Sequence, residues 1–148
     1  MTIPASIANS VQKTQEWLKE LRDNANLENE EEALSILRVV LHQLRDRLTP
    51  EEAVELGAQL PIVIRGLYYE SWRPSRTPER IRSKQAFLDE VTMKLLPRRS
   101  EPERAVQDVF ALIAHHCDPG EISQVIDQLP ADIKRLWPQG ARTYRQRI

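Results

Sequence analysis

Four consecutive residues near the end of the chain carry side chains that commonly bind transition metals. They are His115, His116, Cys117 and Asp118, and imidazole, thiolate and carboxylate groups are the usual ligands of zinc in proteins. Neighbouring residues of a helix point in different directions, so these four side chains are not expected to converge on one ion. In an internal repeat described below, Cys117 takes a core position and Asp118 a capping position. We therefore expect no metal site and no cofactor.

A segment rich in arginine and aromatic residues, Arg65–Arg76, is the strongest candidate for binding. Tyrosine, tryptophan and arginine dominate the energetics of protein–protein interfaces, and the repeat does not account for the extra aromatic rings. We expect an exposed tryptophan here and predict a surface made by these binding residues: Arg65, Tyr69, Trp72, Arg73, Arg76 and Arg80. In the structural alternative, Tyr69 and Trp72 pin a linker and Tyr68 belongs to the core.

These residues favour a non-enzymatic protein-interaction or adaptor module, whose partner is another protein or a second copy of the chain. Aromatic rings between arginines also suit stacking on bases with contacts to phosphates. A nucleic-acid or phosphate-ligand binder using Arg65–Lys84 and the C-terminal arginines is therefore the second hypothesis. A small-molecule enzyme is the third, because the sequence shows nothing that resembles a nucleophile beside a base or a pair of catalytic carboxylates on one helical face. The four glycines are too few for a glycine-rich phosphate loop.

An internal repeat predicts the fold. The stretch 49–68 returns as 118–137 without a gap. The recurring residues are Pro50, Glu52, Gln59, Leu60, Pro61, Ile64 and Leu67, which match Pro119, Glu121, Gln128, Leu129, Pro130, Ile133 and Leu136. The same offset pairs apolar positions upstream, at the spacings that mark one face of a helix. A match that keeps its register over successive segments indicates a duplicated unit. We predict an all-α fold, a tandem duplication of a four-helix unit packed as one pseudo-twofold domain.

Composition and periodicity divide the chain into three parts. We expect a flexible arm over 1–8, a single helical domain over 9–138 and a flexible basic tail over 139–148. The two repeats of the domain cover about 9–70 and 77–138. The first helix is expected to begin near Ser10, with Val11 and Trp17 facing inward.

Later helix starts are marked by side chains that can cap the first turn. They are Asn29, Thr49, Thr77, Ser100 and Asp118, several with an acid three positions later as in a capping box. A proline follows Thr49, Thr77 and Asp118, where the first helical residue needs no N–H. No run alternates apolar and polar residues well enough for a strand.

The overall composition is that of an ordinary globular protein. The chain has 148 residues, a formal net charge of −1 and 29% charged residues, which favour neither nucleic acid nor a membrane surface. A single cysteine excludes an intramolecular disulfide. The N-terminal residues do not resemble a secretion signal, and no stretch approaches the roughly 20 apolar residues of a membrane span. We expect a cytoplasmic protein.

Three stretches of the sequence resemble a known family. They are VQKTQEWLKEL (11–21), LRVVLHQLRDRLTPEEAVELGAQLPIVIRGLYYESWRP (37–74) and VFALIAHHCDPGEISQVIDQLP (109–130). Together they are similar to the bacterial family known as domain of unknown function 2267, over about Val11–Pro138. The resemblance implies a small, largely helical, cytosolic protein and no established activity, so it transfers no catalytic residue. Ser71 stands where similar proteins are expected to have a glycine.

Overall fold

All regular structure in the described part of the chain is helical, as the sequence predicts. The computed structural model describes residues 2–80, 83–95 and 101–144. Its elements, in chain order, are α1 (Ala5–Asn24), α2 (Glu30–Asp46), α3 (Pro50–Gly57), α4 (Ile62–Tyr68), the 3-10 turn η1 (Pro74–Arg76), α5 (Lys84–Leu95), α6 (Pro102–His116), α7 (Pro119–Asp127), α8 (Ala131–Lys134) and α9 (Gln139–Arg142). Within these ranges, none of the helices is both long and apolar enough to cross a bilayer.

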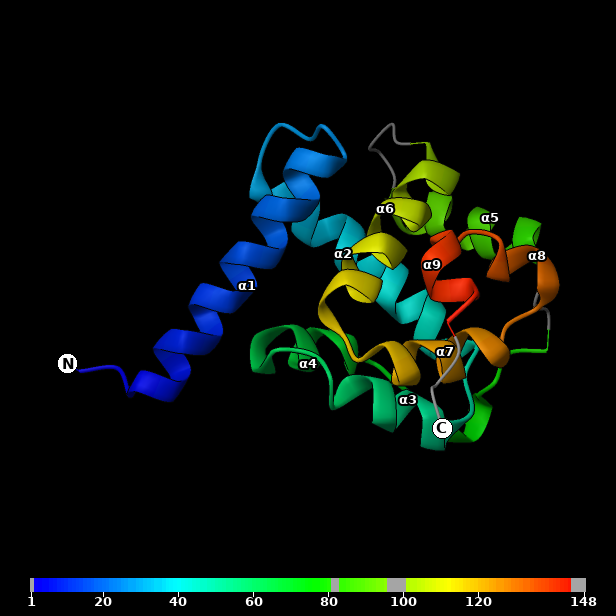
Figure 1. The fold of residues 1–148 in the computed structure, drawn as a ribbon, viewed down its shortest axis with the longest axis horizontal. Helices are drawn as coiled ribbons and strands as arrows, with labels where there is room; N and C mark the ends of the chain where they lie inside the picture. Colours follow the sequence, from blue (N-terminus) through cyan, green and yellow to red (C-terminus); the bar gives the residue numbers. More distant parts are fainter. Residues whose placement is uncertain (1, 81–82, 96–100, 145–148) are drawn as a thin grey trace.

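The hydrophobic core is built around α2, which lies in the middle of the molecule (Figure 1). One stripe of α2, from Ala33 to Leu44, is almost fully buried. Helices α1, α4, α5 and α6 all pack against it. The second half of the chain adds an aromatic cluster, in which Phe110 stacks on Trp137 at 4.1 Å between ring centroids. One continuous core therefore joins residues from both halves of the sequence.

The predicted caps form at three helix starts. The side chains of Asn29, Thr49 and Asp118 each accept the N–H of the residue three positions later, at 2.9, 3.3 and 3.1 Å. Pro50 and Pro119 occupy the first turns of α3 and α7, where a missing N–H costs nothing. These local signals set the first residues of α2, α3 and α7.

Two glutamines connect the halves at matching positions of the repeat. Gln128 Oε1 accepts the backbone N–H of Thr49 at 3.0 Å, and Gln59 Oε1 accepts that of Asp118 at 3.1 Å. Helix α3 packs against α7 between these two bonds. The bonds are reciprocal, because each glutamine binds the cap residue of the other half. Whether the two halves superpose as duplicated units stays a prediction.

The ends of the domain differ from the expected boundaries. Helix α1 begins at Ala5, directly after Pro4 and inside the expected flexible arm. Val11, expected to face inward, is 44% exposed. Residues 139–142 of the expected tail form α9, which packs against α7, and Ala141 contacts the core.

The linker between the halves is longer than expected. Helix α5 begins at Lys84 rather than after Thr77, since the capping bond comes from Ser83, whose Oγ accepts the N–H of Ala86 at 3.1 Å. The expected cap Ser100 lies outside the described residues, and Glu101 precedes α6 instead.

Candidate functional site

Arg65, the first of the predicted binding residues, is committed to the fold. Its guanidinium donates to the carbonyl oxygens of Gly57, Ala58 and Leu60, at 2.8, 3.2 and 3.0 Å. These carbonyls lie at the C-terminal end of α3, where helical partners are lacking. Arg65 therefore caps α3 from α4 and has few donors left for a partner.

Tyr69 and Trp72 pack on the protein rather than standing free in solvent. Both rings are half-buried against the core, with Tyr69 edge-on to Tyr68 at 4.9 Å and 5.3 Å from Trp72. Gly57 makes room for the Tyr69 ring, because a Cβ at Gly57 would lie 2.2 Å from the Tyr69 hydroxyl oxygen. The expected exposed tryptophan is thus a half-buried one, and the rings hold the start of the linker segment, residues 69–80, against α3 and α4.

Polar contacts hold the same segment to α2. Arg38 makes two hydrogen bonds to the Glu70 carboxylate, and the buried Arg45 donates to the carbonyls of Tyr68 and Glu70, at 2.6 and 2.8 Å. Ser71 follows with φ of 58°, a left-handed conformation that favours glycine. This turn explains why a glycine is the expected residue at that position.

Three predicted binding residues remain available on the linker segment. Arg73, Arg76 and Arg80 are exposed, and they form no ion pair with the residues that the structure describes. The predicted surface therefore divides in two. Its first half is structural, and its second half presents three guanidinium groups to solvent.

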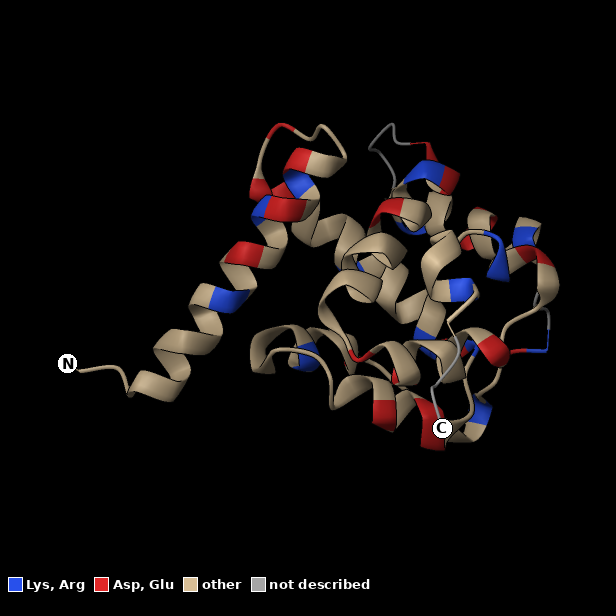
Figure 2. Ribbon diagram, in the orientation of Figure 1, with Lys and Arg blue, Asp and Glu red and all other residues tan. Residues whose placement is uncertain are grey.

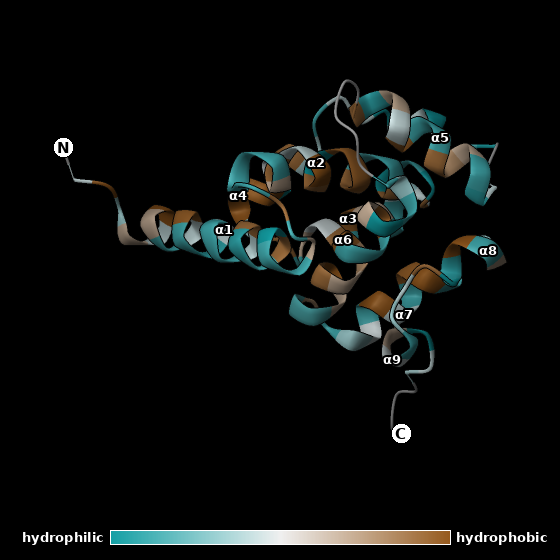
Figure 3. Cartoon of the chain, turned by 90° about the horizontal axis from the view of Figure 1, so that it is seen from above, coloured by the Kyte–Doolittle hydropathy of each residue, from teal (hydrophilic) through white to brown (hydrophobic). Residues whose placement is uncertain are grey.

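Exposed apolar residues that the sequence analysis missed lie near the start of the chain and at the start of α4. The N-terminal half of α1 extends away from the body (Figures 1 and 3). Ile7 and Val11 of this half are 53 and 44% exposed, and Ile3, which precedes the helix, is 62% exposed. Ile62 and Val63, at the start of α4, are exposed as well. We call these five residues the α1–α4 apolar surface. The regular spacing of Ile3, Ile7 and Val11 was the signal in the sequence that pointed to it.

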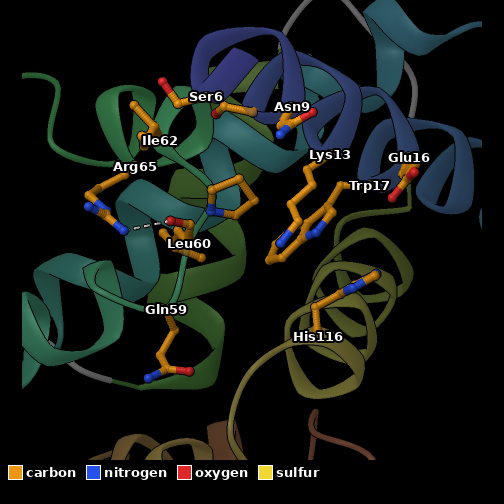
Figure 4. A pocket seen from close by; sticks show the side chains of 12 residues that line it. Ser6, Asn9, Lys13, Glu16, Trp17, Gln59, Leu60, Ile62, Arg65 and His116 are labelled. Carbon is orange, nitrogen blue, oxygen red and sulfur yellow. Dashed lines mark hydrogen bonds between the residues drawn. The ribbon is translucent and has the colours of Figure 1, made fainter.

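A cleft of about 410 Å³ separates α1 from the turn between α3 and α4. Lys13 and Trp17 line it from α1, Leu60 and Ile62 line it from the turn and α4, and His116 closes its base (Figure 4). Helix α4 packs against α1 beside this cleft, and Ser6 and Asn9 of α1 line it together with Ile62 of α4.

Two clusters of ionisable residues come together only in the folded chain. His115 Nδ1 and His116 Nε2 both lie within hydrogen-bonding distance of the Glu20 carboxylate, at 3.0 and 3.1 Å. The residues adjacent to the histidines in sequence, Cys117 and Asp118, take core and capping positions as expected. The residue that joins His115 and His116 is thus Glu20 of α1, and its position beside them cannot be inferred from the spacing of residues in the sequence.

The second cluster joins α3 and α7 through carboxyl groups. Glu52, Glu55 and Glu121 place carboxylate oxygens within 4.8 Å of one another. Burial, together with a hydrogen bond to Glu121 and the charges of Glu121 and Glu55, raises the pKa of the Glu52 carboxyl to about 8. Burial also raises the pKa of Glu121. A carboxyl group with a raised pKa keeps its proton at neutral pH, and this lets the two acids lie close together where burial disfavours a second negative charge.

The fold defines a small all-α protein. Among the described residues, its candidate sites are exposed arginines, exposed apolar side chains and two clusters of ionisable groups, and none of them has the arrangement of a known catalytic site. The chain matches the family model described as "Uncharacterized conserved protein (DUF2267)" over residues 14–136, and it belongs to that family. No curated protein matches the sequence significantly. The family confirms the resemblance and leaves the activity open, so the function has to be argued from the surfaces.

Proposed function

We propose that this protein is a non-enzymatic association module, which binds another protein chain through the α1–α4 apolar surface. The partner that fits best is a second copy of the chain. The proposal rests on α1: one face of this helix packs on the core near its C-terminal end, and the same face reaches solvent near its N-terminal end, where Ile7 is exposed. The predicted interaction role is retained, and the surface that performs it is moved from the linker segment to α1.

One face of α1 is buried in its C-terminal part and exposed toward its N-terminal end. Trp17, Leu18 and Leu21 are buried on the face that packs against the body. Stepping back by three or four residues from this face leads through Thr14 and Ser10, which are polar and buried, to Ile7, which is exposed. Val11, also exposed, lies at the edge of the same face. A helix that is apolar on one side is stable in water when that side is covered. A second chain would supply the cover that this chain lacks.

The exposed area is large enough to contribute to a specific interface. The five side chains of the α1–α4 apolar surface are between 40 and 63% exposed. With about 175 Å² for a fully exposed residue of this size, they offer roughly 450 Å² per chain, about half of the ~800 Å² that each partner contributes to a typical interface. Polar residues around them would supply the rim.

The charge distribution favours an identical partner. The protruding half of α1 has no acidic residue before Glu16 and a single base, Lys13, so most of it is uncharged (Figure 2). Two such helices can approach each other with little repulsion. A strongly charged partner would gain nothing from this surface, because complementarity needs opposite charges.

The test is the oligomeric state of the full chain. We expect the wild-type protein to sediment as a dimer at micromolar concentrations and Ile7→Asp to sediment as a monomer, because a charge in the centre of an apolar interface loses its hydration. Met93→Asp is the matched control, since Met93 is a 70% exposed apolar residue on α5, away from α1. A wild-type monomer at these concentrations, or a dimer that survives Ile7→Asp, would contradict the proposal.

A second candidate function rests on the three exposed arginines of the linker segment. Arg73, Arg76 and Arg80 are suited to phosphate contacts, in line with the second sequence hypothesis. This candidate requires that a single-stranded oligonucleotide binds with an affinity that falls steeply with salt concentration. Arg65 would take little part, because its guanidinium already binds three backbone carbonyls.

A further inference from the structure

We propose that Glu20, His115 and His116 form a binding site for a divalent transition-metal ion, with Zn²⁺ as the expected occupant. The site uses one residue of α1 and the last two residues of α6. Their ligand atoms, one from each side chain, all lie within 4.8 Å of one another. The inference does not depend on the proposed association through α1.

The distances between the ligand atoms suit coordination of one ion. Glu20 Oε1 lies 3.2 Å from His115 Nδ1 and 3.1 Å from His116 Nε2. With metal–ligand distances near 2.0–2.1 Å, tetrahedral or octahedral ligands stand about 2.9–3.4 Å apart. The two measured edges fall within this range, so an ion could replace the hydrogen bonds with little movement of the three side chains.

The adjacent positions of His115 and His116 on α6 do not prevent their side chains from approaching one ion. Side chains of neighbouring helical residues diverge along most of a helix, but these two imidazoles end on either side of a single carboxylate, with ring centroids 4.6 Å apart. They bind through different ring nitrogens, Nδ1 of His115 and Nε2 of His116. This difference brings the two ligand atoms toward one point although the backbone positions diverge.

Neighbouring groups hold the site in place and leave it accessible. The Trp17 ring stacks on the His116 ring at 4.6 Å and 23°, which fixes one ligand against α1. The His115 side chain is 67% exposed, while those of His116 and Glu20 are about one quarter exposed. Three protein ligands with an open side leave room for water on the ion, as in exchangeable or catalytic zinc sites.

The ligand set selects the class of ion. Two imidazoles and one carboxylate suit Zn²⁺, Co²⁺, Ni²⁺ or Cu²⁺, whereas Mg²⁺ and Ca²⁺ prefer sites made of oxygen. Both ring nitrogens that face Glu20 donate a proton when no ion is bound. An imidazole coordinates an ion through an unprotonated ring nitrogen, so the proton that each ring donates to Glu20 has to leave that nitrogen when the ion binds.

An ion at this site would link segments that are far apart in the chain. Glu20 and His115 are separated by 95 residues, and the ion would hold α1 against the end of α6. A ligand that binds only the folded state stabilises it by mass action. Zn²⁺ at about 100 times its dissociation constant should raise the melting temperature by roughly 5–10 °C for a domain of this size.

The experiment uses the full chain without a histidine tag, since a tag would supply competing imidazoles. We expect isothermal titration calorimetry to give one Zn²⁺ per chain and no heat with Mg²⁺. His115→Ala removes a mostly exposed ligand and should weaken binding by at least about 100-fold, because even the loss of an outer-shell partner costs 10–100-fold. Glu20→Gln should weaken binding similarly.

The matched control is Glu16→Gln, which makes the same change one helical turn earlier on α1. Glu16 lines the adjoining cleft with His116, and its replacement should leave the Zn²⁺ affinity within about threefold of wild type, as expected for a residue that is not a ligand. Circular dichroism of each apo variant establishes that it is folded. Absence of Zn²⁺ binding to the wild-type chain, or unchanged binding in folded His115→Ala, would overturn the proposal. Zn²⁺ binding that is lost in Glu121→Gln instead would place the ion at the Glu52–Glu121 cluster and would also overturn it.

Discussion

The carboxyl groups of Glu52 and Glu121 show how a single proton can hold two acids together. Glu52 and Glu121 occupy equivalent positions in the first turns of α3 and α7, each two residues after the proline that starts the helix. Glu52 is only 6% exposed. Ionising both would bury two like charges side by side, so the pair retains a proton at neutral pH. In an unfolded chain, Glu52 would be ionised above about pH 4.5, its ordinary pKa.

This difference predicts a pH dependence of stability. Between the ordinary pKa of 4.5 and the raised pKa of about 8, the folded chain binds a proton that the unfolded chain has released. The free energy of unfolding therefore falls as the pH rises through this window. Glu52→Gln supplies a permanent amide donor to Glu121 and should flatten the dependence, with the largest gain in stability near the upper end of the window.

Urea denaturation across this window measures the effect. The control is Glu51→Gln, because Glu51 is an exposed acid in the same turn and its replacement should preserve the wild-type slope. A Glu52→Gln protein with the same pH dependence as wild type would show that the pair does not share a proton in the folded state.

At the scale of elements, the junction of α3, α4 and the linker segment depends on one close approach. The Tyr69 ring lies over Gly57 of α3, and Arg65 of α4 binds the carbonyl of the same glycine. The absence of a side chain at Gly57 therefore allows the Tyr69 ring to pack directly on the backbone of α3. Gly66, in α4, has no atom within 4 Å of a Cβ built on it.

The two glycines should respond in opposite ways to the same change. Gly57→Ala displaces the Tyr69 ring and should lower the free energy of unfolding by about 1–3 kcal/mol, the usual cost of overpacking. Gly66→Ala should raise it by up to about 1 kcal/mol, because alanine favours a helix and restricts the unfolded chain. Chemical denaturation of both variants measures the contrast. A stabilised Gly57→Ala would mean that Tyr69 moves aside freely and does not hold the linker segment.

At the scale of the whole molecule, the two halves meet through equivalent residues. Gln59 and Gln128 bind the N–H groups of the opposite caps. The next residue of each, Leu60 or Leu129, is buried at 2 and 4% exposure. The repeated sequence Gln-Leu-Pro thus provides, in each half, one hydrogen bond to the opposite cap and one leucine in the core.

Equivalent positions should have equivalent energetics. Leu60→Ala and Leu129→Ala should each lower the free energy of unfolding by about 2–5 kcal/mol, from lost burial and the cavity left behind. Urea titration of both variants tests this. A mild effect at one leucine and a severe effect at the other would indicate that the resemblance between the halves stops at the sequence.

The sequence by itself determined the features that depend on local interactions. Caps, prolines and apolar periodicity act within one or two turns, so α2, α3 and α7 begin where Asn29, Thr49 and Asp118 predict. The buried positions of these helices follow from the same periodicity. The start of α5 was wrong because Thr77–Pro78 and Ser83 offer competing local signals, and the long-range fit of the linker decides between them.

Only the tertiary structure decided which side chains are free. Tyr69 and Trp72 have the composition of a binding site, yet Gly57, Tyr68 and Arg45 hold their segment against the body. His115 and His116 gain a third partner, Glu20, from a helix at the far end of the sequence. Exposure and clustering depend on contacts between distant segments, and the residue types of one segment do not specify which other segment will cover it.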